Sequence, residues 1–201
     1  ALCAMFGRLG VFGAIDLVVS GINPGANVGR AVYHSGTVGA CLTARNGGIS
    51  GVAVSQSVDA FGVEGQGWEE ALGSQVWQGA GDVAAIAVGA LIQDMPDEPI
   101  VLNINVPNRL AEDMAGWKRT DVGHAPPRGL ATAKLEPKPG AHDTYHVEME
   151  WGDAIQIPES DDGGAVMAGY ASLTWLGRLE GLTPHHPTML ATERAMDEFY
   201  R

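Results

Sequence analysis

The chain has 201 residues, 45% of them hydrophobic and 18% charged, so it is long enough to bury a core of ordinary size. Its net charge of −12, from 24 acidic and 12 basic residues, argues against binding to duplex nucleic acid, which favours a basic surface. The longest apolar region, residues 83–92, is about half of the ~20 residues that a membrane-spanning helix needs, so no membrane span is predicted.

The N-terminal segment resembles the inside of a helix more than a targeting signal. It lacks the charged lead-in and the small-residue cleavage site of a signal peptide, and it has no initial Met. Residues 1–10 are typical of the end of a helix that packs on the first strand. Two cysteines, Cys3 and Cys41, are too few for a disulfide scaffold and favour a reducing compartment. We therefore expect the protein in the cytoplasm.

The first part of the chain predicts a strand–helix–strand unit. Residues 16–20 form an apolar run that is too short for a helix and is typical of a buried strand. A loop rich in Gly and Asn follows, and then a helix over residues 35–45 that ends at Gly47 and Gly48. Residues 51–55 predict a second strand. This order implies a parallel sheet with a right-handed crossover.

The rest of the chain predicts two more helices and further strands. After a polar loop at residues 56–67, we expect a helix over residues 68–95 and a third strand over residues 100–106. A loop-rich region over residues 107–140 leads to a β-hairpin over residues 145–157 that turns at Gly152 and Asp153. A last strand is expected over residues 171–175, and a helical tail over residues 188–201. The fold class is therefore α/β, with no internal repeat.

The loop after the first strand carries the side chains best suited to bind a ligand. Ligands of α/β sheets bind at the carboxyl ends of the strands. The amide oxygen of Asn23 suits Mg²⁺ or Mn²⁺, although Asn often bonds only its own turn. Ser35, Gly36 and Thr37 open the next helix and could hold a phosphate, although Ser and Thr also cap helices without any ligand.

Other polar residues favour structural interpretations. His34, beside the candidate site, is better explained as a hydrogen-bonded wall residue than as a general acid. Asp161 and Asp162 precede two glycines, which favours a solvated turn over a metal site. His185 and His186 are adjacent and cannot easily converge on one ion, so they are taken as a loop. Asn103 and Asn105 share a strand face, either near the candidate site or bonding backbone groups.

Several segments together resemble one protein family. The motif on which the resemblance rests is Asp16-Leu-Val-Val-Ser-Gly-Ile-Asn-Pro-Gly-Ala-Asn-Val-Gly-Arg30, followed by Tyr33-His-Ser-Gly-Thr-Val-Gly-Ala40. It closely resembles the central motif of SurE, the family of stationary-phase survival proteins that are metal-dependent 5'/3'-nucleotidases. Later segments, Gly51–Ser55, Leu102–Pro107 and Gly169–Thr174, resemble family segments in the same order, so the match spans nearly the whole chain. Trp175 stands where the family more often has Pro.

The resemblance implies a fold, an assembly and a site. The fold is a Rossmann-like three-layer sandwich with a mostly parallel sheet, a projecting β-hairpin and a C-terminal extension, formed as one domain over residues 1–201. Dimers or tetramers would form through the hairpin at residues 145–157 and the C-terminal tail. Asn23 would bind a divalent metal, Mg²⁺ or Mn²⁺, and Ser35, Gly36 and Thr37 would bind the phosphate of a nucleoside monophosphate.

The sequence departs from the family at its start. Family members begin with a strand that ends in Asn-Asp-Asp-Gly, whose two Asp residues bind the metal, and a later Ser-containing loop completes the site. No Asp pair precedes Asp16, so the chain is expected to be truncated, with the expected catalytic Asp pair absent. One neutral Asn oxygen would bind a divalent ion weakly. We therefore expect little or no activity from this chain alone, and an open sheet edge where the first strand would pair.

Two other functions stay open at this point. The chain could be a non-catalytic scaffold or ligand-binding subunit that keeps the fold. A dinucleotide-dependent oxidoreductase is disfavoured, because Gly21, Gly25 and Gly29 are spaced by four and do not form the G-x-G-x-x-G fingerprint.

Overall fold

The structure is a computed structural model that describes residues 1–58 and 68–201. The predicted loop at residues 56–67 therefore lies mostly outside the described residues. Within the described residues, five strands form one sheet in the order β1-β2-β3-β7-β4. Their bounds are Leu17–Pro24 for β1, Ser50–Gln56 for β2, Val101–Val106 for β3, Trp117–Arg119 for β4 and Ala171–Trp175 for β7.

The sheet is mostly parallel, as predicted. Strand β1 pairs with β2, and β2 with β3, in parallel register. Strand β7 runs antiparallel to β3 and parallel to β4. The first three strands therefore all end at one edge of the sheet, and this edge positions the candidate site.

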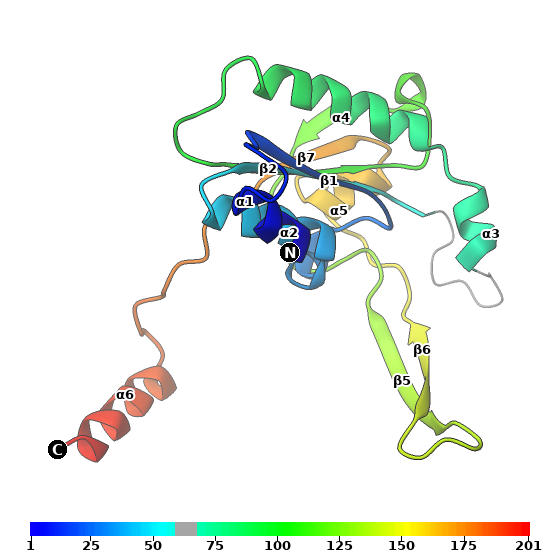
Figure 1. Cartoon of the computed structure of the whole chain (residues 1–201). Coiled ribbons are helices and arrows are strands. Elements are labelled where there is room, and N and C mark those ends of the chain that lie inside the picture. The colour runs from blue at the N-terminus through cyan, green and yellow to red at the C-terminus, as the bar shows by residue number, and fades with distance from the viewer. Residues whose placement is uncertain (59–67) are drawn as a thin grey trace.

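Helices cover both faces of the sheet, so the molecule has three layers (Figure 1). Helix α4, Trp77–Leu91, lies on one face. Helix α2, Gly36–Asn46, and the short helix α5, Asp162–Met167, lie on the other. Two short 3-10 helices, η1 at Gly29–His34 and η2 at Ala111–Asp113, complete the loops. The expected α/β sandwich is confirmed.

The two faces of the sheet differ in polarity. The face under α4 is mainly apolar, with the core residues Val52, Val54, Leu102 and Ile104, and it carries the buried Gln56 at the end of β2. The face under α2 is apolar only toward the start of the strands, where Ala53 and Val101 pack against Val38 and Cys41. Toward the carboxyl ends it carries buried Ser55, Asn103, Asn105, Ser172 and Thr174. A polar surface therefore lies under the loop that joins β1 to α2.

The predicted helix over residues 68–95 is two helices. Helix α3 spans Trp68–Gly73 and α4 begins at Trp77. The backbone N–H of Val76 donates to Oδ1 of Asn108, at 2.8 Å, instead of to a carbonyl in the preceding turn. A hydrogen bond to a side chain distant in the sequence thus interrupts the backbone hydrogen bonding of the helix. The spacing of hydrophobic residues alone could not indicate this break.

The predicted hairpin is misplaced. Strand β6, Tyr145–Trp151, pairs with β5, Leu130–Pro137, and not with residues 154–157. An alternating pattern identifies a strand but not its partner. The prolines of the region lie beside β5 or at its end, so they do not interrupt it. The hairpin projects from the body, as the family resemblance implied (Figure 1).

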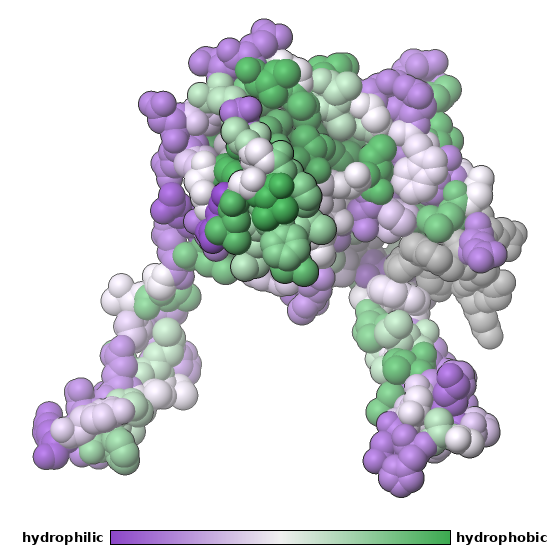
Figure 2. All heavy atoms as spheres, viewed as in Figure 1, coloured by the Kyte–Doolittle hydropathy of each residue, from purple (hydrophilic) through white to green (hydrophobic). Residues whose placement is uncertain are grey.

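The two ends of the chain lie outside the main core. Helix α1, Leu2–Arg8, packs on α2 and not on the first strand as predicted. Figure 2 shows apolar residues gathered over the front of the body, where Figure 1 places α1. Helix α6, Pro187–Phe199, stands away from the body and has His186 as its N-cap. Among the described residues, strand β1 lies at one edge of the sheet, and its Val19 is 52% exposed.

Candidate functional site

The candidate site lies at the carboxyl edge of the parallel strands. Strand β1 continues through Asn23, which the sequence analysis placed in the loop. The register pairs Asn23 with Ser55, and Ser55 with Asn105. Residues paired across a sheet project from the same face. The side chains of Asn23, Ser55 and Asn105 therefore form a polar row across three strands.

Asn23 both closes its own turn and keeps an oxygen available. Its Nδ2 donates to the carbonyl of Gly25, at 2.7 Å, and to that of Pro24, at 3.3 Å. Within the described part of the chain, no group donates a hydrogen bond to its Oδ1. The two interpretations left open by the sequence are thus compatible, because the amide nitrogen shapes the turn while the oxygen can serve a ligand.

The described residues do not by themselves make a metal centre. No group of three His, Cys, Asp or Glu side chains that could hold a metal is found among them. A hard divalent cation requires several oxygen ligands, usually including carboxylates. The half-buried Asn23 offers one neutral oxygen. The donor set therefore fits a partial metal site that needs carboxylates from elsewhere.

The first turn of α2 is capped by one of the predicted phosphate residues. Oγ of Ser35 accepts the backbone N–H of Val38, at 3.0 Å, so Ser35 is the N-cap. Gly36 is exposed, and a Cβ atom added to it would meet no atom within 4 Å. Thr37 is half-buried, and its hydroxyl makes no hydrogen bond within the described ranges. The backbone N–H groups of a first helical turn lack helical acceptors and favour an anion.

The topology brings Asn23 and the first turn of α2 to the same edge. A helix that connects two parallel strands runs antiparallel to them, so it begins beside their carboxyl ends. Helix α2 connects β1 to β2 and packs against both. Asn23 is the penultimate residue of β1 and Ser35 is the N-cap of α2, so both belong to the carboxyl edge. The exposed His34 precedes this turn.

The connecting loop is held to the sheet through Asn27. Its backbone N–H donates to Oδ1 of Asn105, at 2.7 Å, and its Nδ2 donates to Oγ of Ser55, at 2.7 Å. Its carbonyl accepts Nδ2 of Asn103 and of Asn105, at 2.9 and 3.2 Å. Asn103 and Asn105 therefore lie near the site and also satisfy backbone groups, so both interpretations left open by the sequence hold.

Asp162 is not part of a solvated turn, and that prediction is wrong. Its side chain is fully buried and accepts backbone N–H groups of Gly29, Gly123 and Gly163 at 2.8–3.1 Å. Burial raises the pKa of this carboxyl above its ordinary value of 3.8, against the lowering effect of the three N–H donors. Asp161 precedes it as the half-exposed N-cap residue of α5. No local pattern distinguishes this Asp-Asp-Gly-Gly segment from an exposed turn, so sequence reasoning missed it.

Two further predicted groups are structural. Nδ1 of His186 accepts the N–H of Thr188 at the start of α6, far along the chain from the site, and His185 is exposed. Cys41 is a buried residue of α2, and burial raises its pKa to about 12, so it is an inert thiol. No helix of the described residues has the length and apolarity of a membrane span.

A comparison with protein families matches residues 1–128 to the family described as survival protein SurE. The chain belongs to the SurE family. Among solved structures it is similar to the crystal structure of the SurE protein from Aquifex aeolicus, with 25% sequence identity and a TM-score of 0.64. The match covers 97% of this chain and 71% of the Aquifex chain. SurE proteins are generally phosphatases or nucleotidases, and they are generally metal-dependent.

Proposed function

We propose that this chain is the phosphate-binding part of a metal-dependent SurE nucleotidase, which hydrolyses the phosphate ester of a nucleoside monophosphate. The proposal is supported by the topology, which brings to one sheet edge both the first turn of α2 and Asn23, whose Oδ1 accepts no hydrogen bond from the described residues. The amide oxygen would contribute to a Mg²⁺ or Mn²⁺ site. The N–H groups of Gly36 and Thr37, with the Thr37 hydroxyl, would receive the phosphate.

The metal would supply charge to orient the phosphate and to activate water. Asn23 would contribute one ligand to it, and the given sequence has no Asn-Asp-Asp-Gly segment before Asp16. This chain alone is therefore expected to be inactive or strongly impaired. Activity would require the family's N-terminal Asn-Asp-Asp-Gly strand in addition.

The test is an assay of phosphate release from AMP and GMP with Mn²⁺ or Mg²⁺. It compares this chain with a version extended upstream by the N-terminal strand. The extended protein should release phosphate, and the short chain should release little. An extended protein that stays inert with every divalent ion tried would contradict the enzyme proposal and favour a non-catalytic scaffold or ligand-binding subunit.

Matched substitutions in the extended protein test the residues. Asn23→Ala should lower activity by about tenfold or more and weaken the response to Mn²⁺, because a ligand is lost. Thr37→Val should raise the KM for AMP. Their controls are Asn46→Ala and Thr43→Val, which change the same residue types in the second half of α2. Equal losses in the controls would show that the effects come from stability and not from the site.

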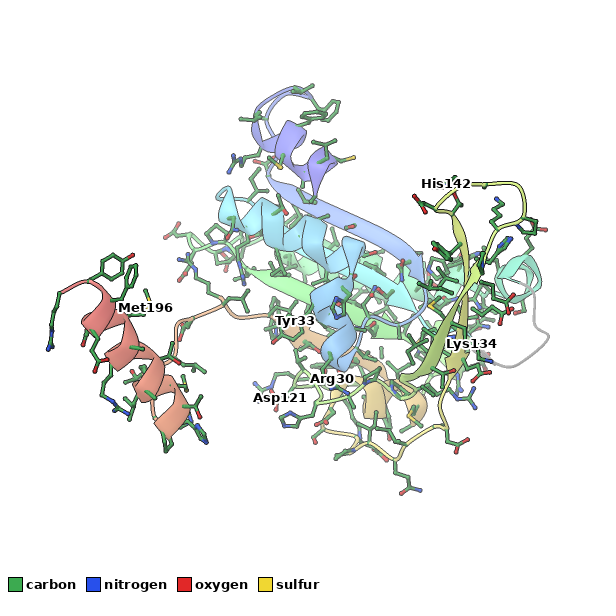
Figure 3. All side chains as sticks on the ribbon, turned by 90° about the horizontal axis from the view of Figure 1, so that it is seen from below. Arg30, Tyr33, Asp121, Lys134, His142 and Met196 are labelled. Atoms are coloured by element: carbon green, nitrogen blue, oxygen red, sulfur yellow. The ribbon has the colours of Figure 1, made fainter. Side chains whose placement is uncertain are left out.

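The proposal extends to assembly and location. Homodimers or homotetramers would form through the hairpin Leu130–Trp151, which replaces the predicted 145–157 range, and through the tail that carries α6. Both project from the body, and Figure 3 shows Lys134 and His142 on the hairpin and Met196 on α6 at opposite sides of it. We place the protein in the cytoplasm, where SurE proteins are generally found.

A further inference from the structure

Three segments that are distant in the sequence meet at the Asp162 carboxylate. Gly29 begins η1, Gly123 follows β4, and Gly163 lies in the first turn of α5. Oδ1 accepts all three N–H groups, and Oδ2 accepts a second contact from Gly29, at 3.0 Å. Figure 3 shows η1, with Arg30 and Tyr33, on the same side of the sheet as the segment that carries Asp121. Gly29 is thus held by both oxygens of one buried side chain.

The chain around Gly29 has little freedom to move. Its φ of +53° favours glycine, and an added Cβ would lie 2.6 Å from the carbonyl oxygen of Ala125. Two residues earlier, Asn27 is bonded to β2 and β3. Val28, between them, is 1% exposed. The loop is therefore fixed at two adjacent points, one on the sheet and one on Asp162.

The burial of the Asp162 carboxyl is not explained by an ion pair. Among the described residues, no Lys, Arg or His forms an ion pair with it. A buried, ionised carboxylate costs free energy, and here its burial opposes ionisation. Backbone N–H groups offset part of that cost. A side chain that is retained against its own burial cost is typical of a functional site.

We propose that Asp162 is a positioning residue, whose two acceptor oxygens fix the β1–α2 loop through the Gly29 amide and so hold Asn23 and the first turn of α2 in place at the sheet edge. This inference rests on the proposed phosphate site. Among the described residues, the side chain of Asp162 bonds Gly29, Gly123 and Gly163 and none of the phosphate residues, so it acts through Gly29.

The test variant is Asp162→Asn. It keeps the shape and an acceptor at Oδ1, but it places an NH₂ donor where Oδ2 faces the Gly29 N–H. The control is Asp161→Asn, which removes a charge one residue away without touching Gly29. The amide exchange rate of Gly29 should rise by about tenfold or more in Asp162→Asn, since hydrogen bonds to charged groups exceed about 1.5 kcal/mol. It should change little in Asp161→Asn.

The second readout is the affinity for AMP in the presence of Mn²⁺, measured on the extended protein by calorimetry with a non-hydrolysable phosphonate analogue of AMP. Affinity should fall by about tenfold in Asp162→Asn and stay within about twofold in Asp161→Asn. A faster Gly29 exchange with unchanged AMP affinity would overturn the positioning role. Unchanged Gly29 exchange would overturn the two-oxygen anchor, because Oδ1 of the Asn side chain still accepts the Gly29 N–H.

Two controls keep the outcomes separate. If the extended wild type does not bind AMP, the proposed function fails, while the exchange rates still decide whether Asp162 anchors the loop. If Asp162→Asn does not fold, the wild type alone is decisive: the Gly29 amide should exchange at least about tenfold more slowly than the Arg30 amide, which lies in the first turn of η1 and has no helical acceptor. Equal rates would refute the anchor.

Discussion

Short polar side chains, more than apolar ones, shape the candidate site. Asn23 bonds its own turn, Asn27 bonds the sheet, and Ser35 caps α2. Each bond ties a specific atom of the loop to a rigid element. Because buried polar groups need partners, a polar network admits few alternative arrangements. This explains how a loop rich in glycine can have one defined shape.

The Asp162 carboxyl gives a pH-dependent prediction. Its pKa is raised above 3.8 by burial, so the folded protein binds this proton more tightly than the unfolded chain. The free energy of unfolding contributed by Asp162 is therefore greatest below its unfolded pKa and falls as the pH rises through the folded pKa. Urea unfolding of the wild type and of Asp162→Asn, from about pH 3 to about pH 7, should show their difference falling with pH.

Asp161→Asn serves as the control for that series, because Asp161 is half-exposed and caps no N–H group with its side chain. Relative to wild type it should lack the fall seen for Asp162→Asn. A difference between wild type and Asp162→Asn that grows with pH would contradict the raised pKa. Titration of the Asp162 carboxyl by NMR gives the same answer independently.

Individual residues were predicted unequally well. Ser35 stands out because it precedes a helix in a recognisable motif, and it is the N-cap of α2. Asp162 does not, because its three donors come from residues 29, 123 and 163. The chemistry of that residue is set by segments that meet only in the folded molecule.

The central strand β3 holds the body together. It pairs with β2 and β7, and all of its residues are buried. Ile104→Ala should lower the free energy of unfolding by about 2–5 kcal/mol, because it leaves a cavity under α4. Urea unfolding measures the loss.

Leu135→Ala on the hairpin is the matched control for that strand, since Leu135 is 65% exposed. Its effect should stay within about 0.5 kcal/mol. A loss at Leu135 as large as the loss at Ile104 would mean that the hairpin is packed in solution, for example against another copy.

Elements whose residue pattern reflects their own burial were predicted correctly. Strands β2 and β3 are short apolar runs because both of their faces are covered. The hairpin and the α3–α4 break were wrong for a common reason. In both cases a partner elsewhere in the chain, β5 or Asn108, decides where the element begins or ends.

The whole molecule consists of a three-layer body and two projections, the hairpin and the α6 tail (Figure 2). The strands of the hairpin are exposed almost throughout. The N–H of Gly152 donates to the carbonyl of Gly129, at 2.9 Å, so the two ends of the hairpin meet. The hairpin can therefore be removed without opening the body.

Replacing residues 130–151 by an Asn-Gly turn should leave the body folded and abolish the proposed assembly, because the projecting apolar side chains are lost. Light scattering measures the assembly, and urea unfolding of the dilute protein measures the body, whose stability should change by less than about 1 kcal/mol. Unchanged assembly would move the proposed interface to the α6 tail or to the apolar patch over α1.

Local spacing in the chain was enough to predict the α/β class, the parallel strands and the first turn of α2, because each depends on neighbours within a few residues. Folding alone decided the partner of β6, the break before α4 and the burial of Asp162. Each of these depends on a hydrogen bond between segments far apart in the chain, and no local pattern carries the identity of a distant partner.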